Sequence, residues 1–182
     1  MTDYSITARG ETGPLPPDDP TRTLTVSHPD DPTSPHIFLA GDTYTVLVSG
    51  KQTHGRYCLL DMLVPDGGGP PPHRHDFEEM FTLLEGELEF MFRGETRTVK
   101  APMTVNIPAN APHRFQNKSG QTVHMLCMCT PAGLEEFFML VGDRVESRTS
   151  LPPQLNEEDR AERRRKAKDL APKYRTEMLI PA

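Results

Sequence analysis

Two histidines separated by one residue follow three glycines and three prolines in the stretch GGGPPPHRHDFEE. Side chains alternate along a β-strand, so an extended chain would point His73 and His75 to the same face. On a helix the two would lie about 200° apart and could not share an ion. Glu79 has the same parity, but four residues of straight strand span about 13 Å. The chain must therefore bend between His75 and Glu79 if all three are to bind one ion.

A fourth candidate ligand is His113, which follows a proline-marked turn in NIPANAPHRFQN. Imidazole nitrogens together with one carboxylate oxygen suit Fe, Mn, Ni, Cu or Zn. An isolated His-x-His pair is more often a surface or core feature than a metal site. The spacing of the neighbouring residues therefore decides between the two interpretations.

That spacing resembles the cupin superfamily. From Gly67 to Gly86 the order is glycine, five residues, His-x-His, three residues, glutamate, six residues and glycine, which resembles the first cupin motif. The stretch from Pro108 to Asn117 resembles the second, and the likeness extends in order over about residues 37–131. The second motif departs from the family pattern at Pro102, Met103 and Asn110. These are turn positions, and the four ligand positions are intact.

The resemblance implies an all-β fold, the cupin double-stranded β-helix or jelly-roll barrel, of the kind built from two sheets. It also implies one divalent transition metal per chain, of unknown identity, held by His73, His75, Glu79 and His113. Four protein ligands leave coordination positions open, which is typical of catalytic sites.

Among cupins, the chain resembles the single-domain bacterial proteins similar to quercetin 2,3-dioxygenase. The features that carry this are the 3-His-1-Glu set, a proline-rich arm and the segment PAGLEEFF. The resemblance implies a dioxygenase acting on a small hydroxylated aromatic or enol substrate, with Glu79 also accepting a proton. The alternatives are a non-oxidative isomerase or lyase that uses the metal as a Lewis acid, and a small-molecule-binding cupin without turnover.

The elements around these residues are mostly strands. Short runs rich in β-branched and aromatic residues are separated by turn signals every 8–12 residues, as in a sandwich or barrel. Residues 76–85 also have apolar residues at helical spacing, but the ligand argument favours a strand there. We expect an extended proline-rich arm over 1–36, a cupin barrel over 37–131 and a helical C-terminal extension over 132–182.

Strand parity also suggests residues for a substrate pocket. Phe81 and Leu83 share parity with Glu79, and Phe115 shares parity with His113. Met125 is a soft side chain that could line the same cavity. Cys127 and Cys129 share one strand face like a Cys-x-Cys metal pair, but buried core thiols are the favoured interpretation and their role stays open.

Composition limits the remaining possibilities. The chain has 182 residues, enough for one domain with a sizeable core, and a net charge of −6 that offers no basic field for nucleic acid. Three cysteines without framework spacing argue against disulfides.

No apolar run approaches a membrane span and nothing resembles a leader, so we expect a cytoplasmic protein. The arm, with Leu24, Val26, Ile37 and Phe38, could add to a neighbour's sheet, so we expect a homodimer.

Overall fold

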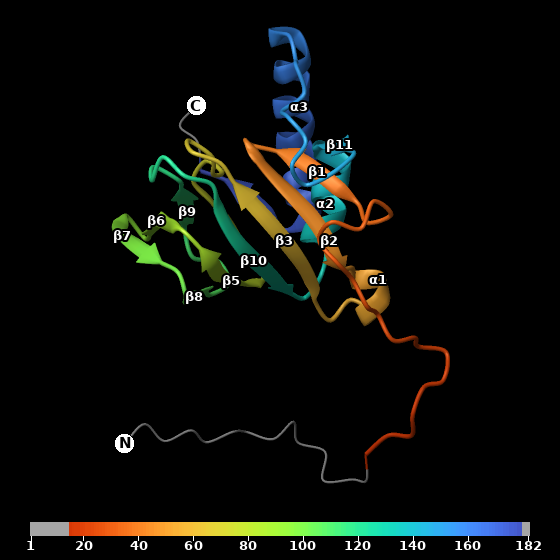
Figure 1. Cartoon of the computed structure of the whole chain (residues 1–182). Helices are drawn as coiled ribbons and strands as arrows, with labels where there is room; N and C mark the ends of the chain where they lie inside the picture. The colour runs from red at the N-terminus through yellow and green to blue at the C-terminus, as the bar shows by residue number, and fades with distance from the viewer. Residues whose placement is uncertain (1–14, 180–182) are drawn as a thin grey trace, which may run out of the picture.

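The computed structural model describes residues 15–179, and the first 14 residues of the expected arm lie outside this range. Two antiparallel sheets form the body (Figure 1). The larger sheet contains, in spatial order, β11 (Asp143–Val145), β1 (His36–Leu39), β2 (Asp42–Val48), β3 (Cys58–Val64), β10 (Val123–Thr130), β5 (Glu78–Glu85) and β8 (Met103–Ile107). The smaller contains β12 (Thr176–Met178), β4 (His73–His75), β9 (His113–Gln116), β6 (Glu87–Phe92) and β7 (Glu95–Lys100). The expected jelly-roll barrel is confirmed.

The core lies between the two sheets and follows the alternation of the sequence. In β10, for example, Val123, Met125, Cys127 and Cys129 are buried, while the residues between them are more exposed. The rings of Phe81 and Phe115, from opposite sheets, have centroids 5.4 Å apart. Apolar burial of this kind is the main stabilising contribution to a sandwich or barrel.

Residues 78–85, which could also be read as part of a helix, form strand β5. This strand pairs on one side with β10 and on the other with β8. The backbone groups of β5 thus bond to two neighbours, and its alternate residues are buried against the smaller sheet. Pairing between distant segments outweighs the local helical spacing of the apolar residues.

The glycine run passes tightly against β9. Gly69 has a φ of 126°, and a Cβ atom there would lie 2.3 Å from the carbonyl oxygen of Phe115. Only glycine fits both this backbone conformation and this approach. Asn110, in the turn before β9, has a φ of 68°. Its side chain tolerates the left-handed backbone expected at that motif position.

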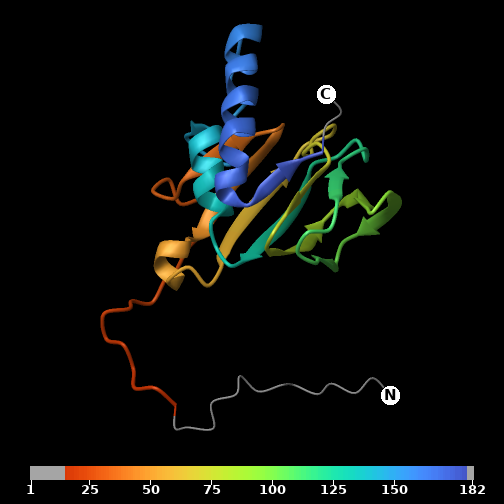
Figure 2. The same cartoon turned by 180° about the vertical axis from the view of Figure 1, so that it is seen from behind.

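The C-terminal segment contains helices α2 (Leu134–Val141) and α3 (Glu157–Leu170) and the short 3₁₀ helix η1 (Ala171–Tyr174). A further short helix, α1 (Gly50–Thr53), follows β2. Figures 1 and 2 show α3 standing out from the barrel beside α2. The segment, for which we expected helices, also adds strands β11 and β12, each to the edge of a sheet. Among residues 15–179, no helix has the length and apolarity needed to cross a membrane.

Strand β12 pairs with β4, the strand that carries His73 and His75. Two ion pairs add to this edge: Arg74 of β4 with Glu177 of β12, and Asp76 with Arg175, which flank the two strands. Backbone bonds from Asp76 N to Arg175 O (3.0 Å) and from Leu179 N to Pro72 O (2.8 Å) extend the pairing beyond the strands. The C-terminal segment therefore holds the His-x-His strand on the side opposite β9.

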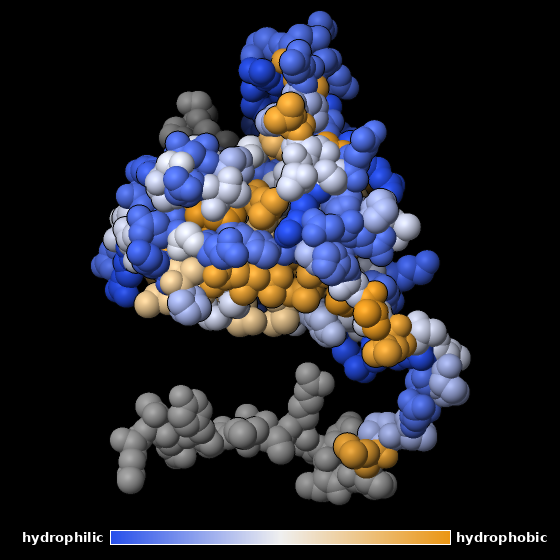
Figure 3. Space-filling view, viewed as in Figure 1, coloured by the Kyte–Doolittle hydropathy of each residue, from blue (hydrophilic) through white to orange (hydrophobic). Residues whose placement is uncertain are grey.

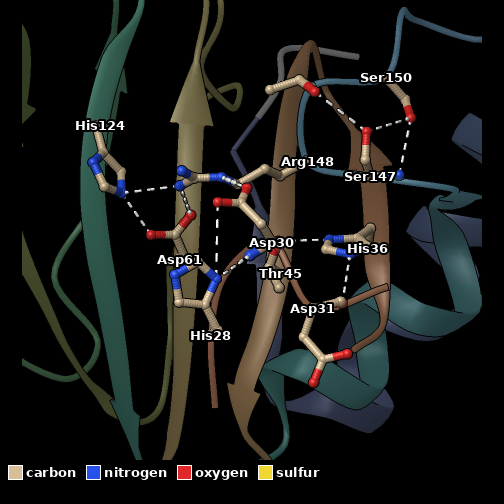
Figure 4. A network of polar contacts seen from close by, with 11 residues as sticks. His28, Asp30, Asp31, His36, Thr45, Asp61, His124, Ser147, Arg148 and Ser150 are labelled. Atoms are coloured by element: carbon tan, nitrogen blue, oxygen red, sulfur yellow. Dashed lines mark hydrogen bonds and ion pairs between the residues drawn. The ribbon is translucent and has the colours of Figure 1, made fainter. Parts of the chain in front are cut away.

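On the outer face of the larger sheet, a polar network joins the arm, the sheet and the loop after β11 (Figure 4). Arg148 donates to Asp30 (2.7 Å) and to Asp61 (2.9 Å), and Asp61 also contacts His124 Nε2 at 2.6 Å. The side chain of Asp61 is only 3% exposed. A carboxylate at this depth requires paired charges or hydrogen bonds.

We expect Arg148→Ala to lower the free energy of unfolding by about 2 kcal/mol, because a buried charge loses its main partner. Urea unfolding followed by circular dichroism measures the change. Arg97→Ala is the control: its side chain is 80% exposed, and we expect a change within about 0.5 kcal/mol. Equal effects of the two substitutions would show that the network contributes no specific stability.

The homodimer stays a prediction. Figure 3 shows apolar residues gathered on the face of the larger sheet and along the arm. Among the exposed large hydrophobic residues are Leu15, Leu24 and Val26 on the arm and Leu84 and Met103 on β5 and β8. The first described part of the arm runs away from the barrel in Figure 1, whereas its later part joins the sheet through Asp30. Exposed apolar residues on the arm and the sheet fit burial against a second copy.

Light scattering at micromolar concentration is expected to give twice the 20.4 kDa chain mass. Replacing Leu24 and Val26 together by Glu should shift the protein towards the monomer, because a charge would enter the expected contact. A mass of 20.4 kDa for the unaltered chain contradicts the prediction.

Candidate metal centre

The chain bends between His75 and Glu79, as the four-residue spacing requires. Strand β4 ends at His75 in the smaller sheet, and β5 begins at Glu78 in the larger one. The turn is supported by a backbone bond from Asn110 N to His75 O at 2.7 Å. His113 enters from β9, where it is the register partner of His73. Crossing between sheets thus turns residues of equal parity towards one point.

The four expected ligand residues form one cluster in the barrel interior. His75 Nε2 lies 3.0 Å and His113 Nε2 lies 3.2 Å from the same atom, Glu79 Oε2. One ligand atom from each of the four residues lies within 4.8 Å of all the others. His75, Glu79 and His113 are buried, and His73 is half-buried. Two segments that are distant in the chain, residues 73–79 and the strand of His113, therefore meet at a single small volume.

Backbone carbonyls orient all three histidine rings. The Nδ1 atoms of His73, His75 and His113 lie 2.9 Å from the carbonyl oxygens of Pro71, Phe77 and Ala111, respectively. Because a carbonyl only accepts, each Nδ1 carries a hydrogen, and Nε2 is the nitrogen whose lone pair a metal would bind. Such outer hydrogen bonds are the usual way in which proteins orient metal-binding histidines.

The electrostatics of the cluster also favour a cation. Burial, together with the neighbouring His113, lowers the pKa of His73 to about 4. For Glu79, burial alone would raise the pKa, but the close contacts of its carboxylate with His113 and His75 outweigh burial and hold the pKa well below its usual range. At neutral pH, His73 is therefore neutral and Glu79 ionised, which are the forms that bind metals.

These residues fit a divalent transition metal. Three imidazole Nε2 atoms and one carboxylate form a mixed nitrogen and oxygen donor set that suits Fe, Mn, Ni, Cu or Zn. Four protein donors are fewer than a five- or six-coordinate ion needs, so exchangeable ligands can bind as well.

A cavity of about 1440 Å³ opens from this cluster. Phe81 and Phe115, two of the residues expected to form a substrate pocket, line its wall, as do His73, His75 and Glu79. Leu83 and Met125, the other two, are fully buried and fill the core. Parity predicts that Phe81, Leu83 and Phe115 point inward, but it does not distinguish the cavity wall from the packed layer behind it.

The sequence left the role of Cys127 and Cys129 open, and the structure places both thiols beside Glu79. Cys127 Sγ lies 3.4 Å and Cys129 Sγ 3.8 Å from Glu79 Oε1, the oxygen that does not face the histidines. Hydrogen bonding with Cys129 lowers the pKa of Cys127, but burial and the charge of Glu79 raise it to about 12. Cys127 therefore stays a thiol that donates to the carboxylate. All three cysteines, including Cys58, are free and buried.

Asn117, at the end of the second motif, is a turn residue. Its side-chain amide donates to the carbonyls of Val64 (2.8 Å) and Gln121 (2.7 Å). Its side-chain oxygen accepts from the backbone and hydroxyl of Ser119. Asn117 thus closes the loop that follows the His113 strand and does not join the ligand cluster.

A double-sheet barrel with three histidines and a glutamate inside is the arrangement that the cupin motifs predict. Residues 60–129 match the family model of the cupin domain, and over this stretch the chain is similar to cupins. An uncharacterized protein of Methanocaldococcus jannaschii is 28% identical over 103 residues, which are 56% of this chain and 82% of that protein.

Two solved structures show the same fold. The polyketide cyclase RemF from Streptomyces resistomycificus has a TM-score of 0.52 and 23% identity, covering 75% of this chain and 90% of that one. A predicted oxalate decarboxylase from Thermotoga maritima has a TM-score of 0.51 and 19% identity, covering 60% of this chain and 99% of that one. At such identities the likeness concerns the fold.

A second buried acid lies near the cavity wall. Asp42 is fully buried, and Tyr44, whose side chain lines the cavity, donates its hydroxyl to Asp42 Oδ2 at 3.3 Å. Among the described residues, Asp42 Oδ1 has no hydrogen-bond partner. Burial raises the pKa of Asp42 to about 8, against the hydrogen bonds from Tyr44 and Gly69 that lower it. Asp42 is therefore largely protonated at neutral pH.

A folded-state pKa above the unfolded value of 3.8 means that Asp42 binds its proton more tightly in the native protein. The free energy of unfolding should fall as the pH rises from about 4 to about 8. Asp42→Asn cannot ionise and removes this contribution, so its unfolding free energy should fall less between pH 5 and pH 8. We expect the difference to exceed about 1.4 kcal/mol, the equivalent of one pKa unit.

Guanidinium unfolding at both pH values measures this difference. Glu95→Gln, at a side chain that is 80% exposed, is the control and should follow the unaltered protein. If Asp42→Asn has the same pH dependence as Glu95→Gln, Asp42 is ionised in the native state at neutral pH.

Proposed function

We propose that the protein is a metal-dependent dioxygenase that acts on a small hydroxylated aromatic or enol substrate bound at one mononuclear site. The observation that carries the proposal is the meeting of three oriented Nε2 atoms with Glu79 at the wall of a cavity that aromatic rings also line. His73, His75, Glu79 and His113 would hold the metal. A divalent transition metal there would supply Lewis acidity towards a substrate oxygen.

Residues of the chain would accept the substrate proton, orient the carboxylate and exclude water. Glu79 is the only carboxylate in the ligand cluster, and its position beside the cavity would let it accept the proton of an enol or phenol bound there. Cys127 donates to Oε1 and so holds the carboxylate with Oε2 towards the histidines. Phe81 and Phe115 offer flat apolar surfaces to a ring and exclude water from it.

A non-oxidative isomerase or lyase is the second candidate. The same donor set would serve Lewis-acid chemistry without dioxygen. The two solved structures named above are called a polyketide cyclase and a predicted oxalate decarboxylase, and these names keep this alternative open. A binding protein without turnover is the third.

Two measurements separate the candidates. Metal analysis of natively purified protein should find about one transition-metal ion per chain. A substrate screen with flavonols and diketones in an oxygen electrode should then show dioxygen consumption that depends on that metal. Turnover without dioxygen uptake would favour the isomerase or lyase, and saturable binding without turnover would favour the binding protein.

Glu79→Gln tests whether this residue is a base as well as a ligand. The substitution keeps the shape and an oxygen donor but removes the charge and the proton acceptor. Three imidazoles remain, so metal occupancy should fall much less than turnover. A general base contributes about 10²–10⁴ in rate, and we expect kcat to fall by about that factor.

His113→Ala is the contrast, because it removes a ligand: metal occupancy and activity should fall together. If added metal restored the full turnover of the Glu79→Gln variant, Glu79 would be a ligand and not a base. Unchanged metal content in both variants would place the ion outside this cluster.

A further inference from the structure

The cavity has a wall that the cupin domain itself does not supply. Residues 60–129 match the family model, whereas much of the cavity lining comes from α2, α3, η1 and β12, all later in the chain. The packing of α2 and η1 connects this wall to the barrel: Phe137 of α2 and Ala171 of η1 are both buried. The C-terminal segment therefore forms part of the candidate binding site.

Helix α3 presents a charge-segregated face to the cavity. Its lining residues are Arg160, Arg163, Arg164, Ala167 and Lys168. Successive turns contribute Arg160, then Arg163 and Arg164, then Ala167 and Lys168, so these residues share one side of the helix. The helix also carries Glu157, Glu158, Asp159, Glu162 and Asp169, and none of these acids lines the cavity. The cavity thus meets a basic surface, although the helix as a whole is nearly balanced in charge.

Two of these basic residues are available to a ligand. Arg163 is paired with Asp143, and Arg164 with Glu157. Within residues 15–179, neither Arg160 nor Lys168 forms an ion pair. Because α3 rises about 1.5 Å per residue, Lys168 lies about 12 Å nearer than Arg160 to the end of the helix that joins η1. Lys168 is therefore the unpaired cation closer to the barrel.

We propose that the cavity takes an amphipathic anion: a molecule with a flat or elongated apolar body and an acidic group, carboxylate, sulfonate or phosphate, that Lys168 binds. Arg160 adds to the positive field further along the helix. The proposal rests on the proposed function, because the substrate's enol or phenol end is placed at the ligand cluster and the acidic group is remote from it. The apolar body lies against the wall that Phe81, Phe115 and Phe138 line.

Two fluorescent probes of similar shape and different charge test this proposal without any turnover. Anilinonaphthalene sulfonate is an aromatic anion, and phenylnaphthylamine is its neutral counterpart. We expect saturable binding of the anion to the full-length protein. Lys168→Ala should weaken that binding about tenfold, since a charge-assisted contact is lost, and should leave the affinity for the neutral probe unchanged. Lys168→Glu should weaken it further.

Lys166→Ala is the matched control, because Lys166 belongs to the same helix and does not line the cavity. This variant should bind both probes like the unaltered protein. Circular dichroism and thermal unfolding verify that each variant is folded, and an exposed lysine on this helix is expected to be dispensable for folding. Equal losses in Lys168→Ala and Lys166→Ala, equal losses for both probes, or no saturable binding of the anion would each overturn the proposal.

Metal analysis of the same variants separates this proposal from the proposed function. Lys168→Ala should retain the metal content of the unaltered protein, because Lys168 is not a ligand. If a chain that holds no metal bound the anionic probe selectively, the dioxygenase proposal would be wrong and the anion-site proposal would stand. If a metal-loaded chain bound both probes with equal affinity, the anion-site proposal would be wrong and the metal-centre proposal would stand.

Discussion

The site depends on three hydrogen bonds from histidine Nδ1 atoms to backbone carbonyl oxygens. Each carbonyl belongs to a residue two positions before or after the histidine that it orients: Pro71 for His73, Phe77 for His75 and Ala111 for His113. Because carbonyls only accept, the bonds determine the tautomer as well as the ring direction. The backbone at the turns thus prepares all three Nε2 lone pairs for one cation.

This arrangement requires the chain to leave one sheet and enter the other within a few residues. The bend after His75 is held by Asn110 from the second motif and by Arg175 from the C-terminal segment, through backbone bonds to His75 and Asp76. The same bend allows Glu79 to face the histidines with one oxygen and the thiol of Cys127 with the other. The barrel strands, the turn after His75 and the C-terminal segment therefore all contribute to the position of the Glu79 carboxylate.

Much of the candidate site could be predicted from the sequence because the relevant information is local. Residue parity determined that His73 and His75 share a face, and the four-residue spacing to Glu79 required a bend. The strand runs and turn spacing predicted an all-β sandwich or barrel, and parity predicted that Phe81, Leu83 and Phe115 point inward. The cupin resemblance joined His113 to the other three candidates as one ligand set and implied the jelly-roll barrel, which parity alone does not provide.

Only the tertiary structure decided the features that depend on contacts between distant segments. The role of β5 as a strand follows from two neighbouring strands, β10 and β8, and the thiols of Cys127 and Cys129 meet Glu79 only through that pairing. Phe81 and Phe115 reach the cavity while Leu83 and Met125 do not. The charged stretch of α3 shows no amphipathic pattern in its sequence. Its basic side becomes a cavity wall because η1 and β12 attach it beside the His-x-His strand, and no local periodicity encodes that attachment.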